Sequence, residues 1–404
     1  MTRIDAFPLE RRWRRIVTLI CLLSFVLIAT GGEALDHGYL VYVGTYTGQG
    51  SEGIYVFRFN PATGEFGPAS LAAATDNPSF LEVDPNGRFL YAVNEIDTFG
   101  QELTGAVSAF AIDRGSGSLR PLQQVSSLGR GPAHLSIDKS GRYLMVANYD
   151  SGNVAVLPIA TDGRLGPRTA FVQDVGSSVD PVRQAGPHAH FIQVTNDNRF
   201  ALAADLGLDQ LLVYRFDATT GSLTPGSPNF VSVDPGAGPR HVAFAPSGDY
   251  LYLVNEMAST VTVFAYNPGL GTLLRKQTIS TLPEQFNDSN TAAEIAVDAK
   301  GRFLYVSNRG DDSIVVFRID PDNGNVSLLE RVSSGGRTPR HFAIDPTGTW
   351  LIAANQDSHD ISLFRIDPDS GRLMKTARSL QIDSPVCVRI VALNSIHHTI
   401  VKEN

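Results

Sequence analysis

Arginine, histidine and glutamate side chains recur in this 404-residue chain at positions where they could bind an anion and activate water. The tripeptide Pro-Arg-His occurs at 239–241 and again at 339–341, each time before an apolar stretch. A planar guanidinium such as that of Arg240 donates two hydrogen bonds at once to a carboxylate or phosphate. A carboxylate such as Glu256, or a histidine, can take a proton from water. Whether these groups form one site depends on the elements that carry them.

The surrounding elements repeat along the chain. Each repeat has an alternating strand, a turn of the Asp-Pro-x-Gly type and a second strand, which is typical of a β-hairpin. The six copies are 77–95, 131–149, 186–206, 238–256, 291–309 and 338–356. A third alternating strand follows, as at 312–320, and a Gly turn leads to a short fourth strand, as at 271–280. Four antiparallel strands that recur about every fifty residues predict a β-propeller.

A seventh blade is expected from the two chain ends. Residues 384–393 restate only the first strand of a blade, whereas 39–47, 53–61 and 65–73 supply three further strands. Pairing them closes the ring and covers an otherwise exposed strand edge. We therefore predict an all-β, seven-bladed β-propeller that forms one domain over 35–404, closed by N- and C-terminal strands in one blade.

The first 34 residues are interpreted as a signal peptide. A basic segment at 11–15 precedes an apolar run at 16–30, and Gly-Glu-Ala at 32–34 offers small residues for cleavage. The alternative is an uncleaved membrane anchor, although the run is shorter than the roughly 20 residues of a spanning helix. The expected destination is the periplasm or the outside of the cell, with no stable membrane insertion after cleavage.

Charge and cysteine content exclude several classes of site. The formal net charge of −8 argues against a nucleic-acid partner, because phosphate backbones are bound by basic surfaces. Cys21 would be lost with the signal peptide, which leaves Cys387 alone. The mature chain is therefore expected to hold neither an internal disulfide nor a zinc–thiolate site.

One position of the repeat is expected to form a ring at the central channel, because the first strand of a propeller blade is innermost. In chain order its residues are Phe80, His134, His190, His241, Glu294, His341 and Cys387. Four histidines in a ring could bind a metal ion. We favour the alternative, in which the imidazoles satisfy backbone groups at the strand ends, and we expect no metal and no cofactor. His188 differs, because it comes from an extra residue in Gly-Pro-His-Ala-His that the other copies lack.

Hairpin geometry groups the candidate residues. The first strand begins and the second ends at the same edge of a blade, so Arg240 and Glu256 are expected side by side. Arg309 comes from the next blade and Arg340 from the one after, while His188 and His190 come from the preceding blade. The group could be a surface salt-bridge cluster, or it could be a pocket for an anionic small molecule that also contains a general base. We favour the pocket.

The chain resembles the lactonase family of seven-bladed propellers, which includes a bacterial 6-phosphogluconolactonase and the fungal carboxy-muconate lactonising enzymes. The motifs that carry the resemblance span essentially the whole predicted mature chain. They are YVGTYT (42–47), GPHAH (186–190), GPRH (238–241), LYLVNE (251–256), AAEIAVD (292–298), LYVSNRGDDSI (304–314), TPRHFAIDPTG (338–348) and LIAANQDS (351–358). The resemblance implies a site made of Arg240, Glu256, Arg309 and either His188 or His190.

The resemblance leads us to expect a lactonase, a carboxylic ester hydrolase that opens a sugar-type lactone to its hydroxy acid without a metal ion. Glu256, or a histidine paired with it, would activate water, and Arg240 would stabilise the oxyanion. Arg309, Arg340, His241 and His341 are assigned to binding an anionic lactone. Two alternatives stay open, namely a non-catalytic secreted propeller that serves as a binding platform, and a cyclase that forms the lactone.

Overall fold

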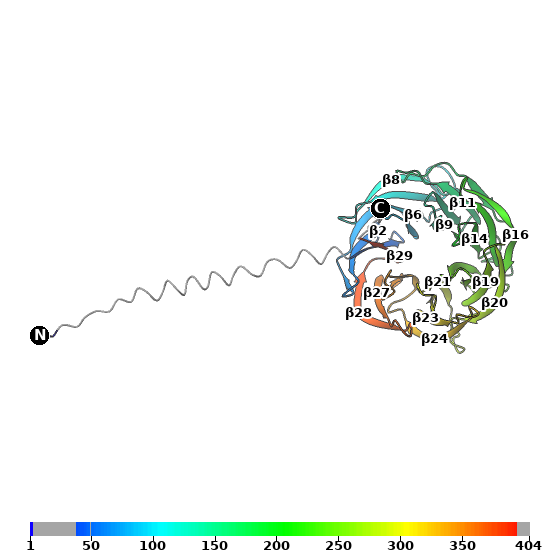
Figure 1. Ribbon diagram of the computed structural model, residues 1–404. Coiled ribbons are helices and arrows are strands. Elements are labelled where there is room, and N and C mark those ends of the chain that lie inside the picture. The colour runs from blue at the N-terminus through cyan, green and yellow to red at the C-terminus, as the bar shows by residue number, and fades with distance from the viewer. Residues whose placement is uncertain (3–37, 49, 394–404) are drawn as a thin grey trace, which may run out of the picture.

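The computed structural model describes residues 1–2, 38–48 and 50–393, and within these residues the chain forms strands and no helix. Seven antiparallel sheets stand around a central axis as the blades of a propeller (Figure 1). The predicted all-β, seven-bladed architecture is confirmed. Nearly all of the predicted signal peptide (1–34) lies outside the described residues. In the described part of the chain, no helix has the length and apolar character needed to cross a bilayer.

Each blade runs from an inner strand at the axis to an outer strand at the rim. The inner strands of blades 1 to 7 are β5 (Leu81–Val83), β9 (Pro132–Ile137), β13 (Ala189–Val194), β17 (Pro239–Phe244), β21 (Thr291–Val297), β25 (Pro339–Ile344) and β29 (Pro385–Ala392). The second strands are β6 (Phe89–Asn94), β10 (Tyr143–Asn148), β14 (Phe200–Asp205), β18 (Tyr250–Asn255), β22 (Phe303–Arg309), β26 (Trp350–Asn355) and β1 (Tyr39–Thr45). The third strands are β7 (Ala106–Ile112), β11 (Asn153–Pro158), β15 (Gln210–Asp217), β19 (Thr260–Asn267), β23 (Ser313–Ile319), β27 (Asp360–Ile366) and β2 (Gly53–Asn60). The outer strands are β8 (Leu119–Ser126), β12 (Ala170–Gln173), β16 (Ser222–Ser232), β20 (Thr272–Ser280), β24 (Val326–Ser333), β28 (Leu373–Gln381) and the pair β3 (Glu65–Phe66) and β4 (Ser70–Ala74).

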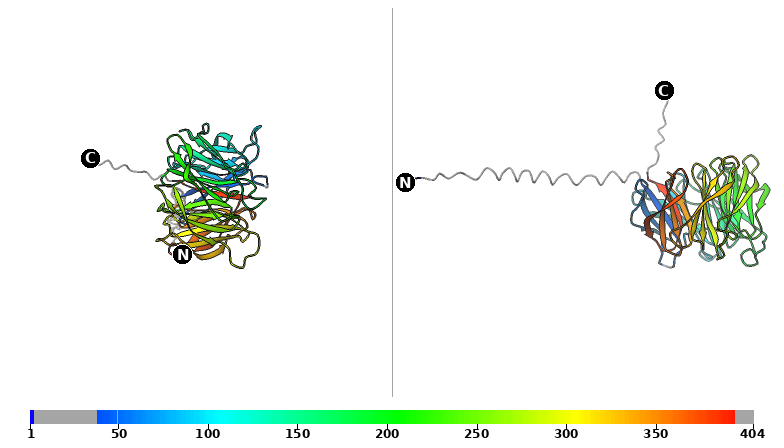
Figure 2. Two further views of the ribbon diagram at one scale, coloured as in Figure 1. Left: turned by 90° about the vertical axis from the view of Figure 1, so that its right-hand side faces the viewer. Right: turned by 90° about the horizontal axis from the view of Figure 1, so that it is seen from below.

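The ring closes through blade 7, which combines both ends of the described chain. Strand β29 pairs antiparallel with β1, from Tyr39 opposite Ala392 to Thr45 opposite Pro385. The side views show the N-terminal strands in blue beside the C-terminal strand in red (Figure 2). The inner strands contact one another in the cyclic order β5, β9, β13, β17, β21, β25, β29 and back to β5. The predicted closure by N- and C-terminal strands is confirmed.

Tyrosines on the second strands tie each blade to the outer turn of the next one. The buried hydroxyls of Tyr42, Tyr91 and Tyr305 donate to backbone carbonyls of glycines in the following blade, each at 2.9 Å. At Gly163, which accepts the bond from Tyr91, φ is +85° and a Cβ atom would collide with the ring of Phe89. Only glycine combines this backbone conformation with such close packing. The apolar core therefore lies between the blades and holds them in a rigid ring around the axis.

Candidate functional site

The edge at which the inner strands begin and the second strands end carries the candidate site. In blade 4, the pairing of Pro239 with Asn255 sets the following residues of the hairpin, Arg240 and Glu256, side by side. Arg240 Nε donates to Glu256 Oε2 at 3.1 Å, and a terminal nitrogen of Arg240 donates to the carbonyl of Ala293 at 2.8 Å. The Arg240 side chain is only 3% exposed. Burial and the neighbouring Arg309 lower the pKa of Arg240 to about 9, which still leaves it charged at neutral pH.

Arg309 joins the pair from the adjoining blade. It ends β22, and its Nη2 lies 2.8 Å from Glu256 Oε2. Burial would raise the pKa of the Glu256 carboxyl, but Arg309, Arg240 and Arg183 together hold that pKa well below its usual range. Glu256 is therefore a stable carboxylate and a weak base. The structure brings Arg240, Glu256 and Arg309 together as the sequence predicted, while their geometry weighs against Glu256 as the group that deprotonates water.

Arg183 is a third cation on the same carboxylate and was missed by the sequence reasoning. Its Nη2 donates to Glu256 Oε1 at 2.7 Å and to the hydroxyl of Tyr149 at 3.2 Å. Arg183 lies in the connection 174–188 between β12 and β13, the longest of the seven links from an outer strand to the next inner strand. The sequence signal for Arg183 is the unusual length of the stretch before GPHAH, which is separate from the extra residue within GPHAH that singles out His188. We call Arg183, Arg240, Arg309 and Glu256 the arginine cluster.

His188 lies half-buried at the end of the same connection. Its ring stacks on Tyr149 with centroids 4.5 Å apart, and its Nδ1 lies 3.0 Å from the Tyr149 carbonyl oxygen. A carbonyl can only accept, so the contact assigns a proton to Nδ1, and in the neutral imidazole Nε2 then keeps the lone pair. The His188 backbone N–H donates to Asp205 Oδ1 at 2.8 Å. Asp205 ends the second strand of its blade, where most other blades have Asn. These contacts set the ring orientation and the tautomer that a general base requires.

His190, two residues further along, occupies a different environment. It is buried, its ring packs edge-on against Tyr149 and His241, and its Nδ1 has no hydrogen-bond partner among the described residues. Burial is the main cause that lowers the pKa of His190 well below the usual value, and the nearby Arg240, His241 and Arg340 lower it further. His190 is thus held neutral inside the propeller, whereas His188 lies nearer its surface.

Arg340, the cation of the second Pro-Arg-His copy, interacts with blade 7 rather than with Glu256. Its Nη2 donates to the hydroxyl of Tyr46 at 2.7 Å, and its guanidinium lies over the Tyr46 ring at 5.2 Å from the centroid. The Tyr46 hydroxyl in turn contacts both oxygens of Glu95 at 2.9 Å. Within the described residues Arg340 forms no ion pair with a carboxylate. It is therefore a cation that a bound anion could neutralise.

The ring position at the channel forms a plug of rings across the axis. Phe80, His134, His190, His241 and His341 contact one another with centroid separations of 4.3–5.8 Å. We call these five residues the ring plug. The Nδ1 atoms of His134 and His341 accept amide N–H bonds from the neighbouring inner strands at 3.4 and 3.3 Å. These two contacts agree with the structural interpretation of the ring histidines.

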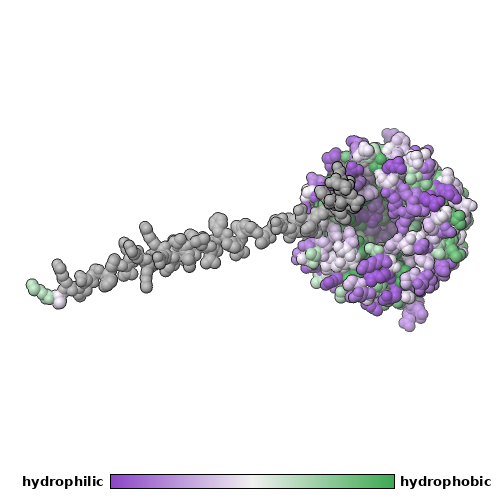
Figure 3. Space-filling view, viewed as in Figure 1, coloured by the Kyte–Doolittle hydropathy of each residue, from purple (hydrophilic) through white to green (hydrophobic). Residues whose placement is uncertain are grey.

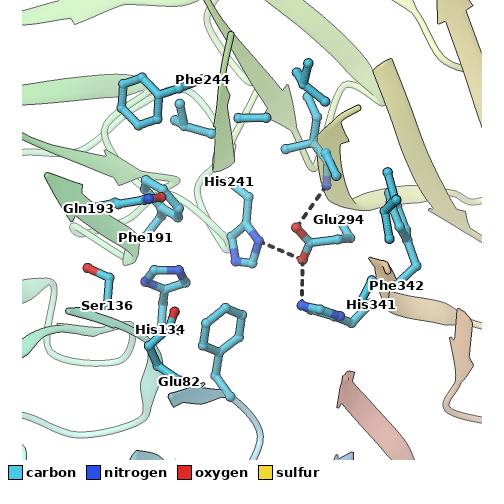
Figure 4. A pocket seen from close by; sticks show the side chains of 18 of the residues that line it. Glu82, His134, Ser136, Phe191, Gln193, His241, Phe244, Glu294, His341 and Phe342 are labelled. Carbon is cyan, nitrogen blue, oxygen red and sulfur yellow. Dashed lines mark hydrogen bonds and ion pairs between the residues drawn. The ribbon is translucent and has the colours of Figure 1, made fainter. Parts of the chain in front are cut away.

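His241 and His341 bind a carboxylate of their own. Glu294 Oε2 lies 3.1 Å from His241 Nδ1 and 3.4 Å from His341 Nε2 (Figure 4). Burial is the main cause that lowers the pKa of His341 to about 3, and burial with Arg240 lowers that of His241 well below normal. Both imidazoles were predicted to bind substrate. They belong to the ring plug and line a small cavity together with Arg240 and Arg340.

A cavity of about 510 Å³ lies at the end of the channel opposite the arginine cluster. It is lined by the later residues of the inner strands, such as Phe244, Val297 and Ile344, and by the His241 and Glu294 side chains. Figure 3 shows the hollow at the centre of the ring, with many hydrophilic residues along its visible rim. A much smaller cavity of about 10 Å³, lined by Arg240, Arg340 and ring-plug residues, lies on the other side. The plug therefore separates two ends of the channel with different chemistry.

The arrangement around Glu256 suits an anionic ligand better than a metal ion. Three guanidinium groups share one carboxylate, and Arg340 adds a further positive charge nearby. In the parts of the chain that the structure describes, no three histidine, cysteine or carboxylate side chains are grouped as metal ligands would be. The donors present can hold an oxyanion, a phosphate or a carboxylate.

A propeller with this cationic, His-flanked edge matches a known class of hydrolase. The family model described as "Lactonase, 7-bladed beta-propeller" matches residues 40–390. The chain therefore belongs to the lactonase family, as the sequence motifs suggested.

Relatives with the same fold are named as enzymes that hydrolyse lactones. The 6-phosphogluconolactonase of Bacillus subtilis is 38% identical over 302 residues, which is 74% of this chain and 83% of that protein. The structure of the periplasmic gluconolactonase of Pseudomonas aeruginosa has a TM-score of 0.83 and 38% identity, covering 88% of this chain and all of the other. A putative 6-phosphogluconolactonase of Bacteroides fragilis has a TM-score of 0.80 and 34% identity, covering 90% and 99%. The chain is accordingly a lactonase similar to the 6-phosphogluconolactonases.

Proposed function

We propose that this lactonase hydrolyses a sugar-type lactone at the arginine cluster, with His188 as general base and without a metal ion. The observation that carries the proposal is the 3.0 Å contact between His188 Nδ1 and the Tyr149 carbonyl oxygen. Its Nδ1–H is committed to the Tyr149 carbonyl, so Nε2 has the lone pair needed to accept a proton from water. The buried Arg240, which is linked to Tyr149 through Glu256 and Arg183, can stabilise negative charge that develops on the lactone carbonyl.

The reaction proceeds in two steps. Water forms a bond to the lactone carbonyl carbon while its proton passes to His188 Nε2, and the carbonyl oxygen becomes an oxyanion that faces Arg240. The ring C–O bond then breaks, and the leaving oxygen takes the proton from His188. The product is a hydroxy acid, which loses its carboxyl proton to solvent at neutral pH.

Glu256 acts as a positioning residue in this scheme. Its pKa is far too low for efficient proton abstraction at neutral pH, because the ideal base has a pKa near the working pH. Its two oxygens instead hold Arg183 on one side and Arg240 with Arg309 on the other. Arg309 and Arg340 contribute positive charge to substrate binding, while His190 and His241 support the floor of the site.

We further propose that the chain is exported and that cleavage follows Ala34. The basic and apolar segments at 11–15 and 16–30 support this, as does the 38% identity to a protein named as a periplasmic gluconolactonase. Export bears on the substrate, since the periplasmic relative is named for gluconolactone, and the Bacillus relative for a phosphorylated lactone. N-terminal sequencing of the exported protein tests the cleavage; an intact segment 16–30 in the membrane fraction would contradict it.

The activity itself is tested by incubating the purified mature protein with glucono-1,5-lactone and 6-phosphoglucono-1,5-lactone, with and without EDTA. Acid release above the spontaneous rate, unaffected by EDTA and strongly reduced in Arg240→Ala, is expected. If no lactone is opened, the binding-platform alternative gains support. If EDTA abolishes turnover and a divalent ion restores it, the metal-free mechanism is wrong.

A further inference from the structure

Arg183 is the most solvent-exposed cation of the arginine cluster. Its side chain is 39% exposed, compared with 3% for Arg240 and 12% for Arg309. Arg240 also donates to the carbonyl of Ala293, and Arg309 to that of Ala292, so much of their hydrogen-bonding capacity is used by the protein. Arg183 stands at the rim, where an incoming ligand meets it first.

The guanidinium of Arg183 has two nitrogens that can still donate to a ligand. Both of its hydrogen bonds, to Glu256 Oε1 and to the Tyr149 hydroxyl, leave from Nη2. Among the described residues, Nη1 and Nε of Arg183 donate to no partner. The Nε–H and the Nη1–H groups lie on different sides of the guanidinium, and each can donate one charge-assisted hydrogen bond to an oxygen of a carboxylate or phosphate.

The loop that presents Arg183 is tightly built. Asp180 Oδ1 accepts the backbone N–H groups of Val182 and Arg183 at 2.9 and 2.8 Å. Gln184 is fully buried and donates to the Leu206 carbonyl at 2.8 Å. These bonds fix the loop, and the bonds from Nη2 to Glu256 and Tyr149 hold the Arg183 side chain before a ligand arrives, which lowers the entropic cost of binding.

The positive charges around Glu256 outnumber the negative ones, which favours the binding of an anion. Glu256 forms ion pairs with all three guanidinium groups of the cluster. Arg340 lies nearby and has no carboxylate ion-pair partner among the described residues. The oxygens of Glu256 hold Arg240 and Arg183 on opposite sides. When the lactone carbonyl contacts Arg240, Arg183 is therefore a second cation, which lies farther from the bond that reacts.

We propose that Arg183 binds an anionic substituent, a phosphate or a carboxylate, at the end of the substrate remote from the lactone carbonyl. Arg183 is thus a specificity-determining residue that selects charged lactones over neutral ones. The inference rests on the proposed lactonase site and deepens it by naming the substrate class. A phosphate and a carboxylate both present anionic oxygens that the Nε–H and Nη1–H groups of Arg183 can bind, and separate substrates distinguish them.

The test compares three lactones with the wild type, Arg183→Gln and Arg183→Lys. Glucono-1,5-lactone is neutral, 6-phosphoglucono-1,5-lactone carries a phosphate and D-glucaro-1,4-lactone carries a carboxylate. Loss of a charge-assisted bond should lower kcat/KM of Arg183→Gln for the preferred charged lactone by roughly 10- to 100-fold, mainly through KM. The loss for the neutral lactone should be several-fold smaller, and Arg183→Lys should recover part of the preference.

A control variant and a binding measurement distinguish failure of the proposed role of Arg183 from failure of the proposed lactonase function. Arg337→Ala removes an exposed arginine whose side chain, within the described part of the chain, bonds only to the backbone carbonyl of Asp357, and it should leave the charged-to-neutral preference as in the wild type. Calorimetric binding of 6-phosphogluconate and of gluconate reports the same preference without turnover. Equal losses for charged and neutral lactones in Arg183→Gln would overturn the role of Arg183. Inactivity of the wild type on all three lactones would instead overturn the proposed function.

Discussion

Arg240 and Glu256 face each other across the inner hairpin of blade 4, with Nε 3.1 Å from Oε2. The corresponding hairpin of blade 6 has Arg340 and the neutral Gln356. There, the arginine donates to Tyr46 of blade 7 instead of to its own hairpin. The two Pro-Arg-His copies thus share a place in the fold but differ in their electrostatic partners.

This difference predicts separate kinetic effects for the two arginines. Arg240→Ala should lower kcat by about two orders of magnitude or more, because it removes a buried donor for the oxyanion. Arg340→Ala should mainly raise KM, because it removes charge that binds the ground state and the transition state alike. Steady-state kinetics on both variants, with circular dichroism to confirm folding, make the comparison. Equal losses in kcat would show that the two copies are functionally equivalent.

The two histidines of GPHAH are expected to differ as well. His188→Ala should lower kcat by roughly 10²–10⁴, the usual contribution of a general base. His190→Asn should mainly lower the melting temperature, because His190 is buried and packs against the ring plug. Thermal unfolding and kcat are measured for each variant. A larger kcat loss in the His190 variant would transfer the base role to that residue.

Glu256 is predicted to matter for stability as well as for activity. Glu256→Gln leaves the buried Arg240 without its carboxylate, and breaking a buried pair on one side typically costs about 3–5 kcal/mol. Urea unfolding at neutral pH measures the change. Glu52→Gln, at an exposed position, serves as the matched control. An unfolding free energy equal to that of the control would contradict the assignment of Glu256 as the anchor of the arginine cluster.

A buried pair of carboxyl groups beneath His188 predicts a pH dependence of stability. Burial and then Asp205 raise the pKa of Asp174 to about 8, and burial also raises the pKa of Asp205. The folded state therefore binds more protons than the unfolded chain between about pH 4 and pH 8. The stability that this proton contributes is complete below pH 4 and is lost as the pH rises through 8.

Asp174→Asn removes this titration while keeping an oxygen that accepts the 3.2 Å bond from the Tyr214 hydroxyl. The melting temperature of the variant, relative to the wild type, should rise between pH 5 and pH 9. Thermal unfolding across that range measures the difference. A difference that does not change with pH would show that the two carboxyl groups do not share a proton.

Strand β29 is expected to be indispensable for the closed ring. Deleting 384–404 removes the buried Val386, Cys387 and Val388 and exposes the edge of β1. The truncated protein should aggregate or melt at a much lower temperature. Deleting 394–404 alone is the matched control, because it leaves β29 in place. Equal melting temperatures for the two deletions would contradict the closure.

The sequence alone determined the propeller, its closing blade and the pairing of Arg240 with Glu256. All three follow from a strand period and a hairpin register, which are local properties that recur with each copy of the repeat. It also singled out His188, through one extra residue in an otherwise regular pattern.

Only the tertiary structure decided which of these residues contact one another and so which role each can have. Arg183 reaches Glu256 from the connection 174–188, whose path depends on the burial of Gln184 in another part of blade 3. The low pKa of Glu256 arises from arginines supplied by three different segments, and no spacing along the chain reveals their convergence. Likewise, Glu294 contacts both His241 and His341 because the inner strands of neighbouring blades meet at the axis. Distances within a hairpin are set by local register, whereas distances between blades are set by how the whole ring packs.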